Sequence, residues 1–507
     1  MTDLVEVRRG AYYDSVSLMQ VSRAVGQTEG VDAALVAMAT ELNTGLLAGM
    51  GFTLGEEVGP NDLLVAIRGA DDAAVKAGQD ALDAALAALK AAGAKAGSFG
   101  DAPPPRTIRS AVTTADANLA VISVPGRNAF VDALDAVQSG LSVMLFSDNV
   151  GVEDEIALKD AAAQADVLLM GPDCGTAVVG GVALGFANAA RAGSVGIVAA
   201  SGTGAQQVMC LLDAAGVGVS HCLGVGGRDL SSAVRGRSTR QALAALAADP
   251  ATTSIVVVSK PPAPEVLEEV QAYAATLGKP VHWATLGQGR PDLTAATEAA
   301  LSADGAPAPQ WPSWPGKASE GGVPGALRGL FCGGTLADEA MLVAGEALGP
   351  IRSNIPLSPD LALGADLRSD SHVVIDFGDD GLTQGRAHPM IDPTLRLERI
   401  VAESNDPTCG VLLLDLVLGY GAHPQPADEL ARAITDAVRR AAEDGRELPV
   451  VVSLTGVEND PQGLTTCATT LQSAGASVFL SNAQATRHAL SLIPSLLPAS
   501  PSSAQEN

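Results

Sequence analysis

Small and hydroxyl-bearing residues interrupt an apolar run in the stretch GIVAASGTGAQQ, at Ser201, Gly202, Thr203 and Gly204. A helix-compatible stretch follows them, and a helix start presents free backbone N–H groups and the positive end of the helix dipole. Glycine also lets a ligand approach the backbone closely. The stretch therefore predicts a binding site for a phosphate or a carboxylate, against the alternative of an ordinary structural turn.

A second stretch, GYGAHPQP, repeats this design, with Gly419 and Gly421 between an apolar run and the helix-compatible ADELARAI. Its glycines are therefore a second candidate anion site. Two such helix starts would face one anion from opposite sides.

The densest polar stretch is IDFGDDGLTQGRAHPMIDPTLR. The planar guanidinium of Arg386 matches a carboxylate, and His388, held by the following proline, offers an imidazole that accepts or donates a proton near pH 7. We expect these two residues to be catalytic, and Asp376 and Asp379 to bind substrate. The alternative is a loop that docks two domains, in which protein partners would satisfy the same side chains.

Polar residues also follow three other apolar runs: Asp173 and Cys174 in GPDCG, Arg228 in GVGGRDL and Lys260 in SKPP. We expect them to bind substrate, although a plain turn and a solvated lysine are the simpler explanations. The six cysteines are scattered, without a CxxC pair or a ligand-like histidine spacing, so we expect no metal site and buried free thiols in a reducing compartment.

The elements that must position these residues recur as a short apolar run, a glycine-containing turn and an alanine-rich helix. Continuous apolar strands that alternate with helices are typical of parallel sheets covered on both faces. Such sheets bind ligands at the carboxyl ends of their strands, where these polar residues lie. The sequence therefore predicts an α/β protein of several doubly wound parallel-sheet domains, Rossmann-like and flavodoxin-like, with a small N-terminal α+β domain.

Composition shifts divide the chain further, notably at the turn-rich GSFGDAPPPR, near Gly193 and at a linker rich in Pro, Gly, Ala and Ser. The expected parts are a small α+β domain (1–104), a Rossmann-like domain (105–193), a flavodoxin-like domain (194–304), the linker (305–325), a second flavodoxin-like domain (326–497) and a disordered tail (498–507).

The 507 residues carry a formal net charge of −26, from 31 basic and 57 acidic side chains that form no long block of one sign. Dispersed negative charge disfavours nucleic acid and anionic membranes as partners. No apolar run approaches the ~18 residues of a membrane span, and the first residues lack an apolar signal core. We therefore expect a soluble, cytoplasmic protein.

Several of these strings, in chain order, resemble the α-subunit of succinyl-CoA synthetase: GPDCG, VGIVAASGTG, CLGVGGRDL, IVVVSK and KPVHWATLG. VVIDFGDD, VLLLDLVLGYG and PVVVSLTGVEND resemble the carboxyl domain of its β-subunit. Essentially the whole chain resembles the FdrA family of acyl-CoA-synthetase-like proteins, through DSVSLM, LFSDNV, MGPDCGT, AASGTG, GGRDLS, VSKPP, GGTLADEA and GRAHPMIDPTLR. The resemblance implies that 105–193 is a CoA-binding-like domain and that 194–304 and 326–497 are synthetase α-type and β-carboxyl-type domains.

The FdrA resemblance implies a subunit of a carbamoyltransferase in purine and allantoin nitrogen breakdown. That enzyme converts oxalurate and phosphate to oxamate and carbamoyl phosphate. The expected ligands are therefore phosphate or carbamoyl phosphate and a small carboxylate or ureide, with no certain cofactor. Further protein subunits would supply catalytic groups that this chain lacks.

Three departures from a nucleotide-driven CoA ligase bear on this interpretation. No stretch has room for an ATP-grasp domain, GQGRPDLTAATEAA has no histidine at the position of a phosphohistidine loop, and RTIRSAVTTADA lacks the glycine-rich turn of a CoA-binding unit. CoA binding is therefore left open. Two alternatives also stay open: an acyl-CoA ligase subunit completed by an ATP-grasp partner, and a non-catalytic scaffold that binds a metabolite.

Overall fold

The apolar runs of the sequence form the strands of four sheets in the described part of the computed structural model. The structure describes residues 1–9, 11, 13, 15–55, 58–59, 62–94, 105–316, 322–383 and 386–493. The predicted tail (498–507), most of GSFGDAPPPR and Asp14 of DSVSLM lie outside these residues. The chain divides into two units, Met1–Pro104 with Gln384–Ala387, and Pro105–Thr383 with His388–Asn507.

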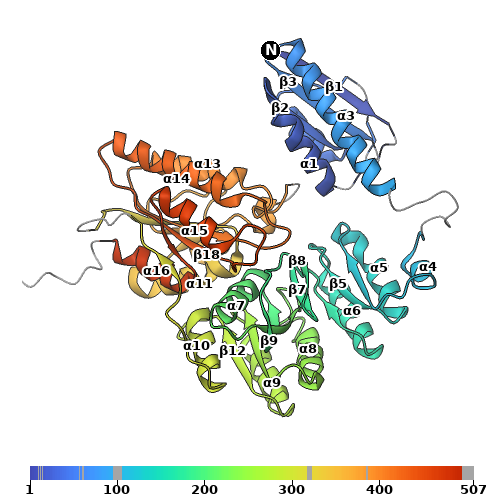
Figure 1. Cartoon of the computed structure of the whole chain (residues 1–507), viewed down its shortest axis with the longest axis vertical. Helices are drawn as coiled ribbons and strands as arrows, with labels where there is room; N and C mark the ends of the chain where they lie inside the picture. Colours follow the sequence, from blue (N-terminus) through green and yellow to red (C-terminus); the bar gives the residue numbers. More distant parts are fainter. Residues whose placement is uncertain are drawn as a thin grey trace, which may run out of the picture. The chain divides into compact units, whose positions relative to one another are not determined.

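The first unit is a small α+β fold around an antiparallel sheet of order β1-β3-β2 (Figure 1). One face of the sheet packs on α1 and α3, and the other packs on α2 and the segment that follows it. Both faces are therefore covered. The elements are β1 (Thr2–Arg8), α1 (Ser15–Gly26), β2 (Val31–Met38), α2 (Glu41–Gly49), β3 (Leu63–Gly69) and α3 (Asp72–Ala94).

The second unit begins with a three-stranded parallel sheet, in which α5 and α6 pack on alanine-rich surfaces over one face. Its elements are α4 (Ile108–Val112), β4 (Leu119–Ile122), α5 (Gly126–Gln138), β5 (Ser142–Leu145), α6 (Val152–Gln164) and β6 (Leu169–Met170).

A six-stranded sheet of order β12-β11-β9-β10-β7-β8 follows. Strands β9 to β12 are parallel, and the antiparallel hairpin β7–β8 pairs with β10. Strands from both sides of residue 193 therefore share one sheet. The elements are β7 (Thr176–Val179), β8 (Val182–Gly185), β9 (Ala192–Ala200), α7 (Gly202–Ala214), β10 (Val219–Gly224), α8 (Arg237–Ala248), β11 (Ser254–Ser259), α9 (Pro264–Ala274), β12 (Val281–Thr285) and α10 (Leu293–Ala303).

The C-terminal sheet has seven strands in the order β13-β19-β18-β17-β14-β16-β15, and all but β13 are parallel. Separate apolar cores cover its two faces. The elements are β13 (Ser313–Trp314), β14 (Ala326–Phe331), α11 (Gly334–Leu348), β15 (Arg352–Ser353), the 3-10 helix η1 (Pro359–Leu361), β16 (Val373–Asp376), α12 (Asp380–Thr383), α13 (Thr394–Ser404), β17 (Cys409–Val417), α14 (Pro426–Glu443), β18 (Val450–Thr455), α15 (Leu464–Ser473), β19 (Ser477–Phe479) and α16 (Asn482–Ser491).

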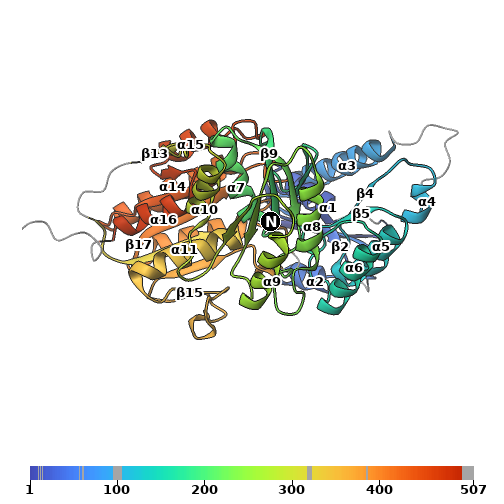
Figure 2. The same ribbon diagram turned by 90° about the horizontal axis from the view of Figure 1, so that it is seen from below.

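The expected α/β class, with parallel sheets and a small N-terminal α+β domain, is confirmed. Within the second unit, α7 packs against both α10 and α11, so this helix lies between the six-stranded and the seven-stranded sheet (Figures 1 and 2). Buried polar contacts hold the two sheets together: the Asn188 side-chain amide donates to Asp460 at 2.7 Å and to the Leu418 carbonyl at 3.0 Å.

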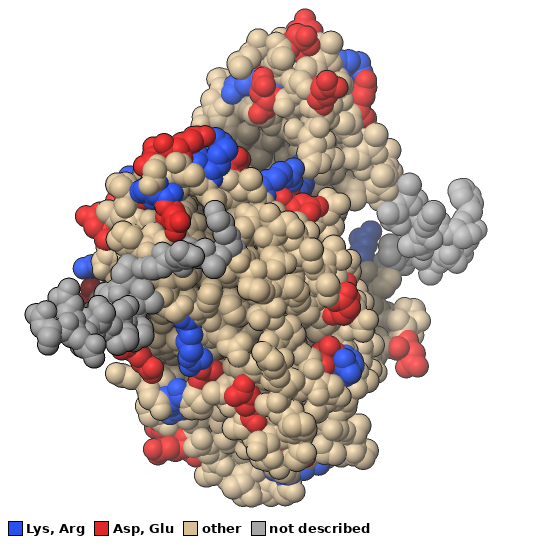
Figure 3. Space-filling model, turned by 60° about the vertical axis from the view of Figure 1, so that its left-hand side comes forward, with Lys and Arg blue, Asp and Glu red and all other residues tan. Residues whose placement is uncertain are grey.

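Acidic and basic side chains are interspersed over the face shown in Figure 3. This distribution agrees with the dispersed charge of the sequence. Among the described residues, no helix is both long and apolar enough to cross a bilayer.

Candidate anion-binding site

Helix α7 begins directly after Ser201, at the position that the sequence predicts. Ser201 has extended backbone at the end of β9, and its hydroxyl accepts a hydrogen bond from the Gly204 N–H at 2.9 Å. Only 7% of Ser201 is exposed, so this cap is built into the core. The cap satisfies the third N–H of the helix. The N–H groups of Gly202 and Thr203 have no carbonyl acceptor within the helix, because they lie in its first turn.

A second helix start lies against the first. The hydroxyl oxygens of Ser201 and Thr335 are 2.6 Å apart, and Thr335 belongs to the first turn of α11. The N-cap of α11 is Gly333, which offers no side-chain cap. A Cβ atom on Gly333 would stand 2.9 Å from the Thr203 hydroxyl oxygen, so only glycine allows this approach. The starts of α7 and α11 therefore meet.

Helix α14 begins at Pro426, just before the predicted ADELARAI, and anion binding by Gly419 and Gly421 stays a prediction. A Cβ on Gly419 would stand 2.5 Å from the Ala187 carbonyl oxygen, and one on Gly421 would stand 3.1 Å from the Phe186 ring. The strand–glycine–helix pattern of RGLFCGGTLADEA is the signal that would have found α11.

A buried ion pair fixes the loop that leads into α11. Asp415 accepts hydrogen bonds from the backbone N–H groups of Cys332 at 2.8 Å and Gly333 at 2.9 Å. The guanidinium of Arg396 donates to the same carboxylate at 2.7 Å, and both side chains are buried. The position of the α11 start is thus set by side chains from β17 and α13.

Three ionisable side chains surround Gly334, the first residue of α11. A Cβ there would stand 2.7 Å from an Asp376 carboxylate oxygen and 2.9 Å from the Lys260 ammonium nitrogen. That nitrogen also lies 3.9 Å from Asp338, and 42% of the Lys260 side chain is exposed. The predicted residues Lys260 and Asp376 are therefore brought together with the helix starts. Asp338 was missed, because its position in α11 is not marked by a turn.

The carboxyl groups near this helix start ionise close to neutral pH. Burial raises the pKa of Asp376 to about 7, although the nearby Lys260 charge opposes the rise. Burial likewise raises the pKa of Asp338 to about 6. The pKa of Asp173 is raised to about 7, first by loss of solvation and then by the charges of Asp380 and Asp148. Protonation of these groups near pH 7 removes negative charge that would repel an anion.

His388 lies beside Asp376, and the expectation for its imidazole was proton transfer near pH 7. A Cβ on Gly378 would stand 2.8 Å from His388 Nε2 and 3.2 Å from an Asp376 carboxylate oxygen. The imidazole packs against Phe186 with ring centroids 5.6 Å apart. Burial, helped by the Arg396 charge, lowers the pKa of His388 to about 4. The imidazole therefore stays neutral at physiological pH and does not donate a proton there, which corrects the expected titration near pH 7.

Arg386 is exposed and falls in the segment grouped with the first unit. Asp379 is half-buried and accepts a hydrogen bond from the Gly381 N–H at 3.1 Å, next to the start of α12. Substrate binding by Asp379 and catalysis by Arg386 remain predictions.

Cys174 and Arg228, two further residues predicted to bind substrate, make their observed contacts within the protein. Cys174 is 2% exposed, and burial raises the pKa of its thiol to about 12, so the thiol stays protonated near pH 7; substrate binding by Cys174 stays a prediction. Arg228 pairs with the buried Glu155 at 2.9 Å and donates to the Val150 carbonyl at 2.7 Å. Its neighbour Asp229 pairs with Lys159 at 2.7 Å. Arg228 and Asp229 thus attach the GVGGRDL turn to α6 through ion pairs, as is typical of a structural loop.

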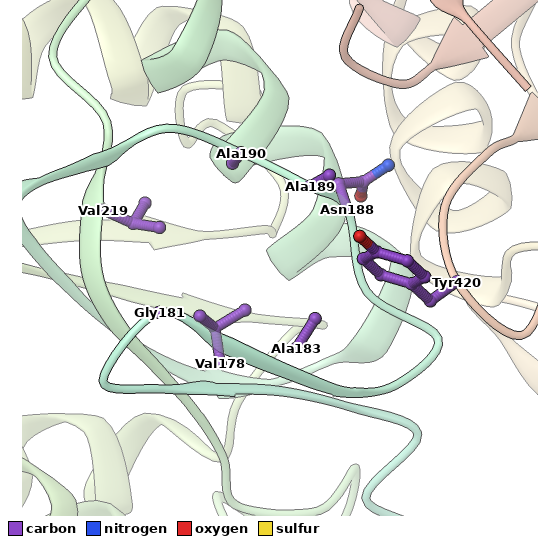
Figure 4. A pocket seen from close by; sticks show the side chains of 8 residues that line it. All are labelled: Val178, Gly181, Ala183, Asn188, Ala189, Ala190, Val219 and Tyr420. Atoms are coloured by element: carbon purple, nitrogen blue, oxygen red, sulfur yellow. The ribbon is translucent and has the colours of Figure 1, made fainter. Parts of the chain in front are cut away.

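A cavity of about 330 Å³ lies away from these residues (Figure 4). It opens beside Val219, at the amino-terminal end of β10, whereas α7 starts at the carboxyl end of β9. Tyr420, from the loop after β17, forms one wall. None of the residues predicted to bind an anion or a substrate lines it. The lining is Val178, Gly181, Ala183, Asn188, Ala189, Ala190, Val219 and Tyr420.

Two family models match parts of the chain. "AllF, heavy metal-associated domain" matches residues 1–102, and "CoA-ligase" matches residues 330–492. The second match contains α11 and most of the strands of the C-terminal sheet.

The chain is 40% identical over 486 residues to the uncharacterized protein YahF of Escherichia coli, covering 92% of this chain and 93% of that one. It is 34% identical over 125 residues to succinate–CoA ligase subunit alpha 2 of Archaeoglobus fulgidus, which is 24% of this chain and 44% of that one. The chain thus spans less than half of that subunit. Among solved structures, an acetyl-coenzyme A synthetase of Ca. Korarchaeum cryptofilum is similar at 16% identity, over 76% of this chain and 87% of that one, with a TM-score of 0.30.

Proposed function

The chain belongs to the family of the Escherichia coli protein YahF, and from that premise we propose that it is the acyl-phosphate-binding component of an acyl-CoA ligase. The meeting of the two helix starts at Ser201 and Thr335 carries the proposal. The match of residues 330–492 to the CoA-ligase model and the partial match to succinate–CoA ligase alpha subunits support it.

In this proposal the phosphate group lies between α7 and α11. The N–H groups of Gly202 and Thr203 reach it from one side and those of Gly334 and Thr335 from the other. Lys260 adds a positive charge beside Gly334. Together these groups stabilise the negative charge that grows on phosphate as it leaves the acyl group.

The bonds that form and break when an acyl phosphate becomes a thioester suggest a role for the buried carboxyl group of Asp376. A CoA thiolate attacks the acyl carbon, the bond from that carbon to the phosphate oxygen breaks, and the electron pair of the broken bond leaves with phosphate. The thiol proton must be taken up, and we assign this role to Asp376, a buried carboxyl group beside Gly334 whose pKa is about 7. His388, with its pKa lowered to about 4, is too weak a base and serves as a neutral wall.

We propose that a partner subunit makes the acyl phosphate. No histidine lies between β12 and α10, where a phosphohistidine would be expected from the resemblance to succinyl-CoA synthetase. The carbamoyltransferase role implied by the FdrA resemblance uses the same kind of ligand, carbamoyl phosphate, but the relatives found here give it no support. It remains a prediction that the experiment below tests directly.

Calorimetric titration of the full-length chain with acetyl phosphate, carbamoyl phosphate and inorganic phosphate tests the site. We expect saturable binding that Lys260→Met weakens at least tenfold, about 1.4 kcal/mol. Lys279→Met is the matched control, because Lys279 donates to the Leu246 and Asp249 carbonyls at the C-terminal end of α8. Equal affinity of Lys260→Met and wild type would overturn the site.

Turnover separates the functions. We expect thioester formation from acetyl phosphate and CoA, or from a carboxylate, ATP and CoA once an ATP-grasp subunit is added. Release of carbamoyl phosphate from oxalurate and phosphate, without thioester formation in either assay, would favour the carbamoyltransferase instead. Binding without turnover in any assay would indicate a scaffold.

A further inference from the structure

The N-terminal unit lacks the side chains that heavy metals prefer, although the family model that matches it is named for heavy-metal association. The first cysteine of the chain is Cys174 and the first histidine is His221, so no thiol or imidazole lies between Met1 and Pro104. Thiolate and imidazole are the ligands that select copper, zinc and related ions. The donor set of this unit does not fit such an ion.

The remaining sulfur atoms of the unit do not converge on one point. Met38 is buried in the core against α1 and α3, whereas Met50 packs in the opposite core beneath α2. Met19 belongs to α1, and Met1 is 89% exposed at the start of the chain. No group of three or more His, Cys, Asp or Glu side chains suited to a metal occurs in the part of the chain that the structure describes.

An arginine instead joins the parts of this unit. The guanidinium of Arg68, on β3, donates to both carboxylate oxygens of Asp3 on β1, at 2.7 and 2.6 Å. It also donates to the carbonyls of Met50 at 3.0 Å and Gly51 at 3.3 Å, in the segment after α2. The same group lies over the Phe52 ring, 4.4 Å from the ring centroid.

These contacts combine four hydrogen bonds and a ring contact in one side chain. A two-pronged arginine–carboxylate pair fixes both orientation and distance, and a guanidinium over an aromatic face adds a further attraction. One residue thereby links a strand, its antiparallel neighbour and the segment that covers the second face of the sheet. A guanidinium keeps its charge at every physiological pH, so this link depends on neither metal supply nor redox state.

We propose that the N-terminal unit binds no heavy metal and that Arg68, joined to Asp3, Met50, Gly51 and Phe52, holds its sheet and covering segment together. The proposal is independent of the function assigned to the second unit. It makes this unit a metal-independent module of the protein.

Metal loading of the full-length protein tests the first half. The protein is incubated with Zn²⁺, Cd²⁺ or Cu⁺ under reducing conditions and desalted, and metal per chain is measured by mass spectrometry. Hydrogen exchange is then followed in peptides from β1, β2 and β3, with each metal and with EDTA. We expect identical exchange in these peptides under every condition.

Stoichiometric metal together with slower exchange in the N-terminal peptides would overturn the proposal. Metal whose effect is confined to peptides after Pro104 agrees with it, because every thiol and imidazole of the chain lies there. Absence of bound metal agrees with it as well.

Arg68→Gln tests the second half, with Lys76→Gln as the control. Lys76 forms an exposed ion pair with Asp80 one turn along α3, and its loss should leave exchange unchanged. We expect Arg68→Gln, and likewise Asp3→Asn, to speed exchange of β1 and of residues 50–52 by about tenfold or more. Exchange in Arg68→Gln as slow as in wild type would refute the role of Arg68.

Discussion

The hydroxyl oxygens of Ser201 and Thr335 lie 2.6 Å apart, although 134 positions separate these residues in the sequence. This contact joins the starts of α7 and α11, which come from two different sheets. The first turns of the two helices thereby lie together, with Lys260 and Asp376 beside the first residue of α11.

Ser201→Ala should lower both stability and anion affinity. It removes the N-cap of α7 and the contact with Thr335, so we expect a loss of about 1–2 kcal/mol in the free energy of unfolding. Ser481→Ala is a close control, because Ser481 caps α16 and its hydroxyl lies 2.7 Å from that of Thr294. Denaturant titration should show similar losses for both, and phosphate titration a loss for Ser201→Ala alone. Equal phosphate affinities of the two variants would contradict the site.

Gly334→Ala should weaken phosphate binding at least tenfold, about 1.4 kcal/mol, because the new methyl group would collide with Asp376 and Lys260. Gly345→Ala is the control in the same helix. A Cβ at Gly345 meets nothing within 4 Å, and alanine favours helix by up to about 1 kcal/mol, so stability should hold or rise. Titration calorimetry and thermal unfolding measure the two effects. Unchanged phosphate affinity in Gly334→Ala would count against the anion site.

Sulfate should bind more tightly as the pH falls from about 8 to about 6, by at least about threefold. Sulfate keeps its charge over this range, whereas Asp376 and Asp338, with pKa values of about 7 and about 6, become protonated and stop repelling it. Asp376→Asn should flatten this dependence. A profile in Asp376→Asn that remains as steep as that of wild type would show that Asp376 does not face the anion.

The raised pKa of Asp376 also predicts how the stability of the fold depends on pH. Because burial raises the pKa of Asp376 above its ordinary value of about 4, ionisation costs the folded protein free energy. The free energy of unfolding should therefore fall as the pH rises from about 4 to about 7, and Asp376→Asn should remove part of that fall. Denaturant titrations at several pH values measure it, and a wild-type stability that rises over this range would contradict the assignment.

Arg228→Gln and Lys260→Gln should have opposite effects. Replacing Arg228 removes one of the partners of the buried Glu155. The substitution should therefore lower the free energy of unfolding by about 1–3 kcal/mol, with little change in phosphate affinity. Lys260→Gln should weaken phosphate binding and leave stability nearly unchanged, because its side chain is 42% exposed. Paired unfolding and binding measurements separate the two. The reverse pattern would make Arg228 the anion ligand.

The sequence by itself determined the fold class and the start of α7. Short apolar runs rich in β-branched residues or leucine, such as SIVVVS and GVLLLDLV, indicate buried strands when turn residues bound them, and the small residues after such a run indicate a helix start. It also determined that the N-terminal unit has no cysteine or histidine to bind a metal, because that depends on residue types alone.

Only the tertiary structure decided which helix start faces Ser201. GYGAHPQP and FCGGTLAD look alike in sequence, but the order of strands in the seven-stranded sheet brings α11, not α14, to α7. Tertiary packing likewise buried Cys174, engaged Arg228 with Glu155 and moved the pKa values of His388 and Asp376 in opposite directions. Desolvation and pairing depend on neighbours that are far away in the chain, so no local pattern of residues reveals them.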